Sequence, residues 1–243
     1  MKKDSTKNKT ELYLIIFFLL VIGFFFYISL TNPLIRAIRK GQNISGLVVG
    51  CDEVDYARHA DTIIFLNYQP KEHFLNLLFI PRDTKVDTED LRVKRINEIY
   101  AYFCRRENNI NLACQNFTKV IETFLSNGDR EVRIPYYLEL NYRGFVKMVN
   151  LLGGIPIKID KVMDYHDTWG NLHIHFEPGE YLLNGEKALE YVRYRDESGD
   201  PERIIRQQRF LRNLVHRIRN PLLIFKLPFL IKESITTLHT NLS

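Results

Sequence analysis

One uncharged apolar run near the N-terminus constrains the architecture of this chain more than any other feature. It extends from Leu12 to Leu30 and is long enough to cross a bilayer as a helix. A cleaved signal peptide is the alternative interpretation. However, the run is longer than the apolar core of a signal peptide, and no small-x-small cleavage site follows it. We therefore expect an uncleaved membrane anchor over residues 12–30.

The charges that flank this run give a slight orientation signal. Four lysines precede the run, and three basic residues follow it within ten residues. By the positive-inside rule, this bias favours a cytoplasmic tail over residues 1–11 and an extracytoplasmic remainder. A polar connector is expected at residues 31–43 and a folded domain over residues 44–243. The expected location is thus the cytoplasmic membrane, with a single pass.

Strand-like and helix-like segments alternate through the expected domain. Short apolar runs typical of buried strands and amphipathic runs typical of helices follow one another. Strands are expected at 44–50, 61–68, 74–80, 132–140 and 155–159, and helices at about 94–102, 115–125 and 142–152. A further helix is expected after the cap residue Asn184, through Tyr191. This alternation favours an α/β fold with a layered sheet.

Charged side chains lie at the ends of the first three expected strands. Asp52 follows the first strand, and Asp61 stands at the start of the second. If the short connection reverses the chain, both aspartates meet at one edge of the sheet, close enough to share a divalent cation. Alternatively, each aspartate caps a turn, and spacing does not decide between the two. The third strand ends at Pro81, which projects Arg82 from the strand end, where α/β sheets tend to bind ligands.

A charge-rich stretch from Tyr191 to Phe210 contains five arginines. A charge run is usually a solvated helix face, but here the helical spacing adds a constraint. After Pro201, apolar residues at helical spacing predict a buried stripe of Phe210, Leu211, Leu214 and Ile218. The stripe continues four and eight residues before Leu211 with Gln207 and Arg203. Polar groups that point inward require partners. Arginines that converge at a helix N-terminus suit an anion, most simply a phosphate.

Cysteines and histidines offer no clear catalytic or metal site. Cys104 and Cys114 lie between two expected helices, where they form a disulfide in an exported domain or remain two free thiols. Cys51 has no visible general base, so we interpret it as a buried strand-end residue. His173 and His175 share one strand face without a third ligand at metal spacing, which favours a surface hairpin over a zinc site.

Taken in order, the motifs of this chain resemble those of the LytR-CpsA-Psr (LCP) family of bacterial cell-envelope phosphotransferases. Most are weak alone, but their order and separations are specific, and the single N-terminal anchor also fits the family. They are Gly50-x-Asp52, Asp61-Thr62, Ile80-Pro81-Arg82-Asp83-Thr84, Arg95-Ile96-Asn97, Leu152-Gly153-Gly154-Ile155, Leu183-Asn184-Gly185, Tyr191-Val192-Arg193-Tyr194-Arg195 and Asp200-x-x-Arg203-x-x-Arg206-Gln207.

The resemblance implies a layered α/β/α domain with a central mixed β-sheet. It also implies transfer of a phosphoglycan from a polyprenyl-pyrophosphate carrier to peptidoglycan, with release of polyprenyl phosphate. The expected partners are the lipid-linked glycan, the peptidoglycan acceptor and the membrane, and the expected cofactor is Mg²⁺ (or Mn²⁺). A net charge of +5 and a pI near 9.0 fit an acidic partner. No nucleic-acid partner is expected, because the domain is exported and lacks a helix-turn-helix signal.

The resemblance also assigns roles residue by residue. The metal-binding aspartates of the family correspond to Asp52 and Asp61. Its catalytic residues correspond to the pyrophosphate-binding arginines Arg82, Arg195 and Arg203 and to Asp200, which orients them. Further pyrophosphate contacts are expected from Arg95, Arg193, Arg206 and Gln207.

Three departures from the family pattern stand out. The family often has Arg-Ser before its second aspartate, where this chain has His59-Ala60, so one phosphate-binding arginine is either missing or supplied by Arg58. An Asn-rich segment with Cys104-Arg105-Arg106 replaces an expected Gly-Gly. Family members usually continue beyond the position of Ser243, which fits either a minimal domain or a truncated chain.

Two other functions remain open from the sequence. One is a non-catalytic or regulatory envelope protein that binds polyprenyl phosphate or an anionic glycan. The other is a hydrolase that releases the lipid-linked chain to water. Transferase and hydrolase differ only in which hydroxyl attacks, so the sequence does not separate them.

Overall fold

The structure is a computed structural model, and it describes only part of the chain. The described residues are 31–54, 57–88, 91, 93–127, 130–167, 172–194, 200–220, 223, 229 and 237–242. The expected tail and anchor lie outside these residues, as does Arg195. Within them, no helix has the length and apolar character needed to cross a bilayer. The described residues form two compact units, one within 31–45, 67–76 and 242, the other within 46–66 and 77–241.

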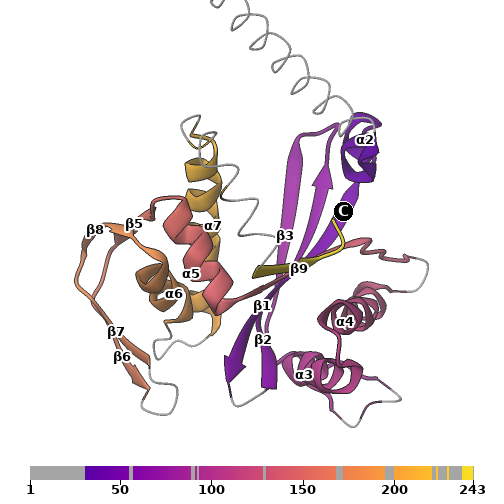
Figure 1. Cartoon of the computed structure of the whole chain (residues 1–243), viewed down its shortest axis with the longest axis horizontal. Coiled ribbons are helices and arrows are strands. Elements are labelled where there is room, and N and C mark those ends of the chain that lie inside the picture. The colour runs from indigo at the N-terminus through magenta and orange to yellow at the C-terminus, as the bar shows by residue number, and fades with distance from the viewer. Residues whose placement is uncertain are drawn as a thin grey trace, which may run out of the picture. The chain divides into compact units, whose positions relative to one another are not determined.

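A five-stranded sheet with strand order β3-β2-β1-β4-β9 is the centre of the fold (Figure 1). Its strands are β1 (Ile44–Val54), β2 (Ala57–Gln69), β3 (Phe74–Ile80), β4 (Tyr136–Asn141) and β9 (Leu238–Thr240). β4 pairs in parallel with β1 and antiparallel with β9. The sheet is therefore mixed, and the expected α/β fold with a central mixed sheet is confirmed.

β1 and β2 are longer than the sequence predicted. β1 runs past Gly50 to Val54, and β2 begins at Ala57 instead of Asp61. A Cβ placed on Gly46 would meet Leu66, and one on Gly50 would meet Thr62. Because these contacts run in opposite directions along the two strands, the pair is antiparallel. Both aspartates thus lie within strands instead of in the connection between them.

Two helices cover one part of this sheet. They are α3 (Ile96–Glu107) and α4 (Ile110–Leu125), which form a hairpin in which Asn109 caps α4 by accepting a hydrogen bond from the Leu112 N–H. Their buried side chains form one core with the sheet residues Leu47 and Ile63. Cys104 and Cys114 are free thiols in this hairpin, so the structure shows no disulfide between them.

Three further helices and two strand pairs form a second core. The helices are α5 (Tyr142–Leu151), α6 (Gly185–Arg193) and α7 (Asp200–Ile218). β5 (Ile155–Ile159) pairs with β8 (Gly179–Leu183), and β6 (Met163–Asp167) pairs with β7 (Leu172–Phe176). Each pair is a separate two-stranded sheet. The predicted hairpin is present here, and Asn184 caps α6 as expected, by accepting a hydrogen bond from the Lys187 N–H.

Two predictions at the domain ends need correction. The expected polar connector at 31–43 contains a short helix, α2 (Pro33–Arg39), which Asn32 caps through hydrogen bonds from the N–H groups of Leu34 and Ile35. The apolar stripe of α7 is shorter than predicted. Phe210 is buried, but Ile218 is 55% exposed, so the stripe ends before the last turn of the helix.

Candidate functional site

Asp61 of β2 accepts hydrogen bonds from side chains of two other elements. Arg82, in the turn after β3, donates from Nη1 to Oδ1 at 2.5 Å. The hydroxyl of Tyr142, the first residue of α5, donates to Oδ2. Burial alone would raise the pKa of Asp61, but these hydrogen bonds and the charges of Arg82 and Arg203 lower it. The carboxylate is therefore held ionised in a fixed orientation.

Asp52 of β1 lies close enough to Asp61 for the two charges to interact. Its Oδ1 accepts a hydrogen bond of 3.2 Å from the His59 N–H and lies 3.7 Å from the His59 Nδ1. Burial and the negative charge of Asp61 together raise the pKa of Asp52. The side chains of Asp52 and Asp61 thus lie close together, as an antiparallel pairing of β1 and β2 predicts.

These two carboxylates fit a magnesium ion in donor type and number. Mg²⁺ takes oxygen ligands, and it is typically held by one or two carboxylates together with water and substrate phosphates. Among the described residues, no group of three or more His, Cys, Asp and Glu side chains is arranged to hold a metal. The donor set is therefore suited to a cation shared with a bound phosphate, and less suited to an all-protein metal cage.

Three arginines from different parts of the fold carry charges that favour the ionised forms of the two aspartates. Besides Arg82, Arg193 at the end of α6 lies over the Tyr142 ring, 4.7 Å from its centroid, and its charge favours the ionised form of Asp52. Arg203, in the first turn of α7, is only 5% exposed and lowers the pKa of Asp61. Guanidinium groups present several N–H donors in a planar fork that matches phosphate oxygens.

Gln207 connects α7 to the sheet beside Asp61. Its Nε2 donates to the Thr62 Oγ1 at 3.2 Å and to the Val192 carbonyl oxygen at 3.4 Å. Arg203 lies four residues earlier and therefore on the same face of α7. This geometry explains why two polar residues continue the apolar stripe, since that end of the helix faces the aspartates.

Arg206 lies on another face of α7. Its Nη2 donates to the Tyr194 carbonyl oxygen at 2.7 Å, and its guanidinium lies over the Tyr194 ring. Arg206 thus contacts Tyr194, whereas Gln207 contacts Thr62.

The remaining expected site residues fall into three cases. Arg95 is the N-cap residue of α3 and is exposed, and its side chain makes no hydrogen bond or ion pair with the described residues. Asp200 begins α7, but its side chain is not described, and Arg195 lies outside the described residues. Arg58 donates from Nη1 to the Oε1 of the fully buried Glu139 at 3.1 Å, so one of its amino groups contacts a core carboxylate.

Tyr142 was not predicted from the sequence, although it contacts Asp61. Its position depends on the parallel pairing of β1 and β4, in which Cys51 lies opposite Asn141. That register places the residue after Asn141 near the functional end of β1. Strand order and register are long-range features, so the local sequence carries no direct signal for this contact.

The chain matches a family model and several curated proteins. The model is that of the LytR_cpsA_psr family, over residues 28–243. The polyisoprenyl-teichoic acid–peptidoglycan teichoic acid transferase TagV of Bacillus subtilis (strain 168) is 30% identical, over 88% of this chain and 53% of the relative. TagU of the same strain, which has the same description, is 30% identical over 85% of this chain and 62% of the relative. The chain therefore spans little more than half the length of these relatives.

Solved structures show the same fold. The crystal structure of B. subtilis TagV matches with a TM-score of 0.64 and 26% identity, over 83% of this chain and 74% of that chain. The crystal structure of B. subtilis TagU matches with a TM-score of 0.57 and 28% identity, over 83% and 77% of the two chains. TagT bound to LI-WTA, at 23% identity, has a TM-score of 0.60 over 83% and 70%, a likeness of fold alone.

Proposed function

This chain belongs to the LytR-CpsA-Psr family, and from that premise we propose that it is a phosphotransferase of the glycopolymer–peptidoglycan ligase type. In the proposed reaction, a phosphoglycan moves from a polyprenyl-pyrophosphate carrier to peptidoglycan. The names of the relatives TagV and TagU, which describe transfer of teichoic acid to peptidoglycan, support this class of donor and acceptor.

The convergence of side chains on Asp61 is the observation that carries the proposal. Arg82 and Tyr142 each donate a hydrogen bond to one of its two carboxylate oxygens. The charge of Arg203 lowers the pKa of Asp61, and Asp52 lies close enough to Asp61 for the two charges to interact. Guanidinium groups placed beside two oxygen-donor carboxylates are the groups that a pyrophosphate and its cation require.

The proposed step exchanges one P–O bond for another. The acceptor hydroxyl oxygen bonds to the phosphorus that carries the glycan, and the bond from that phosphorus to the bridging oxygen breaks. Polyprenyl phosphate leaves with the bridging oxygen, and the proton of the hydroxyl passes to solvent or to a nearby base. Arg82, Arg193 and Arg203 stabilise the charge that grows on the leaving phosphate. Removal of one such donor raises the activation free energy by about 3 kcal/mol.

We propose Asp52 and Asp61 as ligands of Mg²⁺ (or Mn²⁺). The bound ion supplies charge neutralisation to the pyrophosphate oxygens. The chain itself orients Asp61 as a metal ligand, because hydrogen bonds from Arg82 and Tyr142 fix its carboxylate. Side chains that hydrogen-bond to a metal ligand commonly have this role.

Arg195 and Asp200 remain proposed catalytic residues. Arg195 follows Tyr194 in the sequence, two residues after Arg193, and Asp200 is the first residue of α7, three residues before Arg203. Arg95 and Arg206 are left out of the proposed pyrophosphate site, since the first is exposed at the N-terminus of α3 and the second contacts Tyr194.

We also propose that residues 12–30 anchor the chain in the cytoplasmic membrane, with residues 44–243 on the extracytoplasmic side. The length and apolar character of the run support the anchor. A polyprenyl carrier is itself a membrane lipid, so an anchored enzyme meets its donor at the membrane surface.

The test uses the full chain in detergent micelles. The protein is incubated with a polyprenyl-pyrophosphate-linked oligosaccharide, Mg²⁺ and peptidoglycan fragments, and the products are identified by mass spectrometry. We expect polyprenyl phosphate and a peptidoglycan fragment that carries the phosphoglycan, with loss of both products in EDTA and in Asp61→Asn. Release of free phosphoglycan alone would indicate a hydrolase. No release of polyprenyl phosphate under any of these conditions would contradict the proposal.

A further inference from the structure

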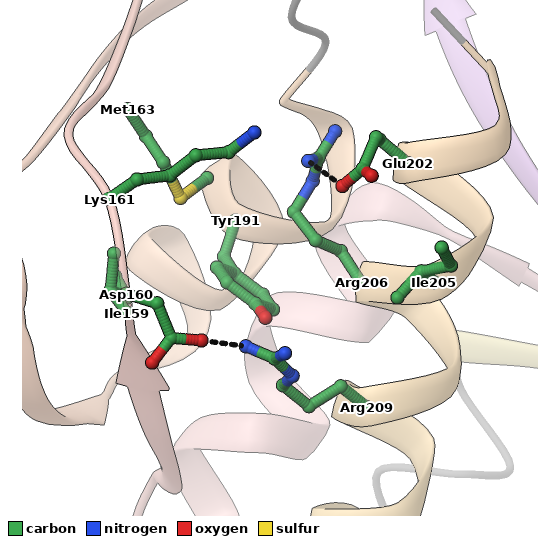
Figure 2. A pocket seen from close by; sticks show the side chains of 9 residues that line it. All are labelled: Ile159, Asp160, Lys161, Met163, Tyr191, Glu202, Ile205, Arg206 and Arg209. Atoms are coloured by element: carbon green, nitrogen blue, oxygen red, sulfur yellow. Dashed lines mark hydrogen bonds and ion pairs between the residues drawn. The ribbon is translucent and has the colours of Figure 1, made fainter. Parts of the chain in front are cut away.

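A pocket lies on the face of α7 that carries Arg206. Its volume is about 170 Å³, and Figure 2 shows α7 on one side and the end of β5 on the other. Glu202, Arg206 and Arg209 line it from α7, and their spacings of four and three place them on one helix face. Arg203 and Gln207 lie one residue further along the helix than Glu202 and Arg206, which turns them by about 100°, and neither residue lines this pocket.

Tyr191 of α6 forms the floor of this pocket. It is 1% exposed, and its ring lies between the β5 side and α7 (Figure 2). Its hydroxyl is buried and donates no hydrogen bond within the described part of the chain. Arg209 lies beside this hydroxyl, but a guanidinium can only donate, so it cannot accept the hydroxyl proton. A buried O–H donor without an acceptor is costly, so a ligand atom that accepts from it would be favoured.

The mouth of the pocket carries charges of both signs. Arg209 Nη1 lies 2.9 Å from Asp160 Oδ2, and Arg206 Nη1 lies 3.9 Å from Glu202 Oε2. Lys161 extends over the same opening (Figure 2). Phosphate would meet two carboxylates at this mouth. A ligand that carries both an amino group and a carboxylate can complement both kinds of charge.

The volume and the lining limit the size of the group that enters. A cavity of about 150 Å³ accommodates a molecule the size of benzene, so a pocket of about 170 Å³ suits an amino-acid side chain better than a substituted hexose. Ile159, Met163 and Ile205 supply apolar surface, which complements the aliphatic part of such a side chain.

We propose that this pocket binds a short peptide with an amino group, a carboxylate and an aliphatic body, as found in the peptide part of the peptidoglycan acceptor. The inference rests on the proposed function, which makes peptidoglycan a substrate. On this view, α7 has two roles. Its Arg203 and Gln207 face contacts the donor pyrophosphate, and its Glu202, Arg206 and Arg209 face holds the acceptor peptide.

The test is a binding titration of the full chain in detergent, without lipid donor or metal. The probes are N-acetylmuramyl-L-alanyl-D-isoglutamyl-L-lysine, peptide-free N-acetylmuramic acid and inorganic phosphate. We expect the muramyl tripeptide to bind most tightly, and Arg209→Ala to weaken its binding about tenfold, because one charge-assisted hydrogen bond is lost. Tyr191→Phe should also weaken binding. The matched control is Arg212→Ala, an exposed arginine on the same helix, which should bind as the wild type does.

The outcomes separate this inference from the proposed function. Equal binding of all three probes, tighter binding of phosphate, or unchanged tripeptide binding in both Arg209→Ala and Tyr191→Phe would overturn it. A wild-type chain that releases polyprenyl phosphate but binds no tripeptide would also overturn it, while the proposed function would stand. Tripeptide binding that depends on Arg209, without any release of polyprenyl phosphate, would support the peptide site and contradict the phosphotransferase.

Discussion

Arg82 and Asp61 form a hydrogen-bonded ion pair between the end of β3 and the neighbouring strand β2, with Nη1 2.5 Å from Oδ1. The pair joins a proposed phosphate-binding group to a proposed metal ligand. Both side chains are mostly buried, with exposed fractions of 29% and 16%, so solvent screens their interaction only partly. Each residue therefore fixes the position of the other before a substrate binds.

Tyr142→Phe tests whether the second hydrogen bond to Asp61 serves the metal site. The substitution removes the donor to Oδ2 and so weakens the stabilisation of the ionised carboxylate. We expect the Mg²⁺ concentration for half-maximal release of polyprenyl phosphate to rise about tenfold, as for other outer partners of metal ligands. The Mg²⁺ dependence of the initial rate measures this effect.

The control for this substitution is Tyr181→Phe. The Tyr181 hydroxyl donates to the Glu177 carbonyl oxygen in the β7–β8 connection, away from both aspartates. Its Mg²⁺ dependence should match that of the wild type. If Tyr142→Phe also matched the wild type, Tyr142 would have no part in orienting the metal ligand.

Arg58→Ala tests whether the buried carboxylate of Glu139 in β4 requires its ion pair with Arg58. Glu139 is fully buried and accepts hydrogen bonds from Arg58 Nη1 at 3.1 Å and Cys51 Sγ at 2.6 Å. Removal of the arginine leaves the carboxylate without its close cation, so we expect the free energy of unfolding to fall by about 3 kcal/mol. Urea denaturation of the full chain in detergent measures the loss.

Arg133→Ala is the matched control for the buried pair. Arg133 pairs with Glu131, but both side chains are mostly exposed, and exposed ion pairs contribute little. We expect no measurable change in the urea midpoint. Equal stability of Arg58→Ala and Arg133→Ala would mean that Glu139 does not need Arg58 in the folded state.

Gly185→Ala tests the contact between α5 and α6. A Cβ at this position would lie 2.7 Å from the C and Cα atoms of Val146, and backbone atoms cannot move aside as a side chain can. We expect a loss of about 1–3 kcal/mol in the free energy of unfolding. Gly46→Ala is the control, because its nearest contact is the movable Leu66 side chain at 3.3 Å. A Gly185→Ala chain as stable as Gly46→Ala would contradict the close approach of the two helices.

Local patterns in the sequence predicted much of this fold. Apolar runs located β3 and β5 with the bounds that the structure shows, and Asn184 marked the start of α6. The same patterns missed the ends of β1 and β2, since polar residues such as Asp52 and His59 can occupy strands when cross-strand pairing satisfies their backbone groups. The sequence patterns did not predict helix α2, because the helix has only 7 residues and the residues on either side of it are polar.

The candidate site could be predicted only in part. The motifs located Asp52, Asp61, Arg82 and Arg203, whose side chains act on one another in the structure. Tyr142 and Glu139 were missed because their roles depend on the parallel pairing of β4 with β1, which no local pattern reveals. The family resemblance assigned Arg206 to the pyrophosphate site together with Gln207. One residue on a helix turns the side chain by about 100°, and in the structure Arg206 contacts Tyr194 while Gln207 contacts Thr62.

Release of polyprenyl phosphate by Arg203→Ala is the measurement on which the proposed phosphotransfer depends most. Arg203 is buried beside Asp61, whereas Arg212 on the same helix is exposed and serves as the control. With a polyprenyl-pyrophosphate-linked oligosaccharide, Mg²⁺ and peptidoglycan fragments, we expect Arg203→Ala to lose at least about 100-fold in rate while its unfolding curve stays cooperative. Arg212→Ala should retain the wild-type rate. A folded Arg203→Ala chain that releases polyprenyl phosphate at the wild-type rate would contradict the account.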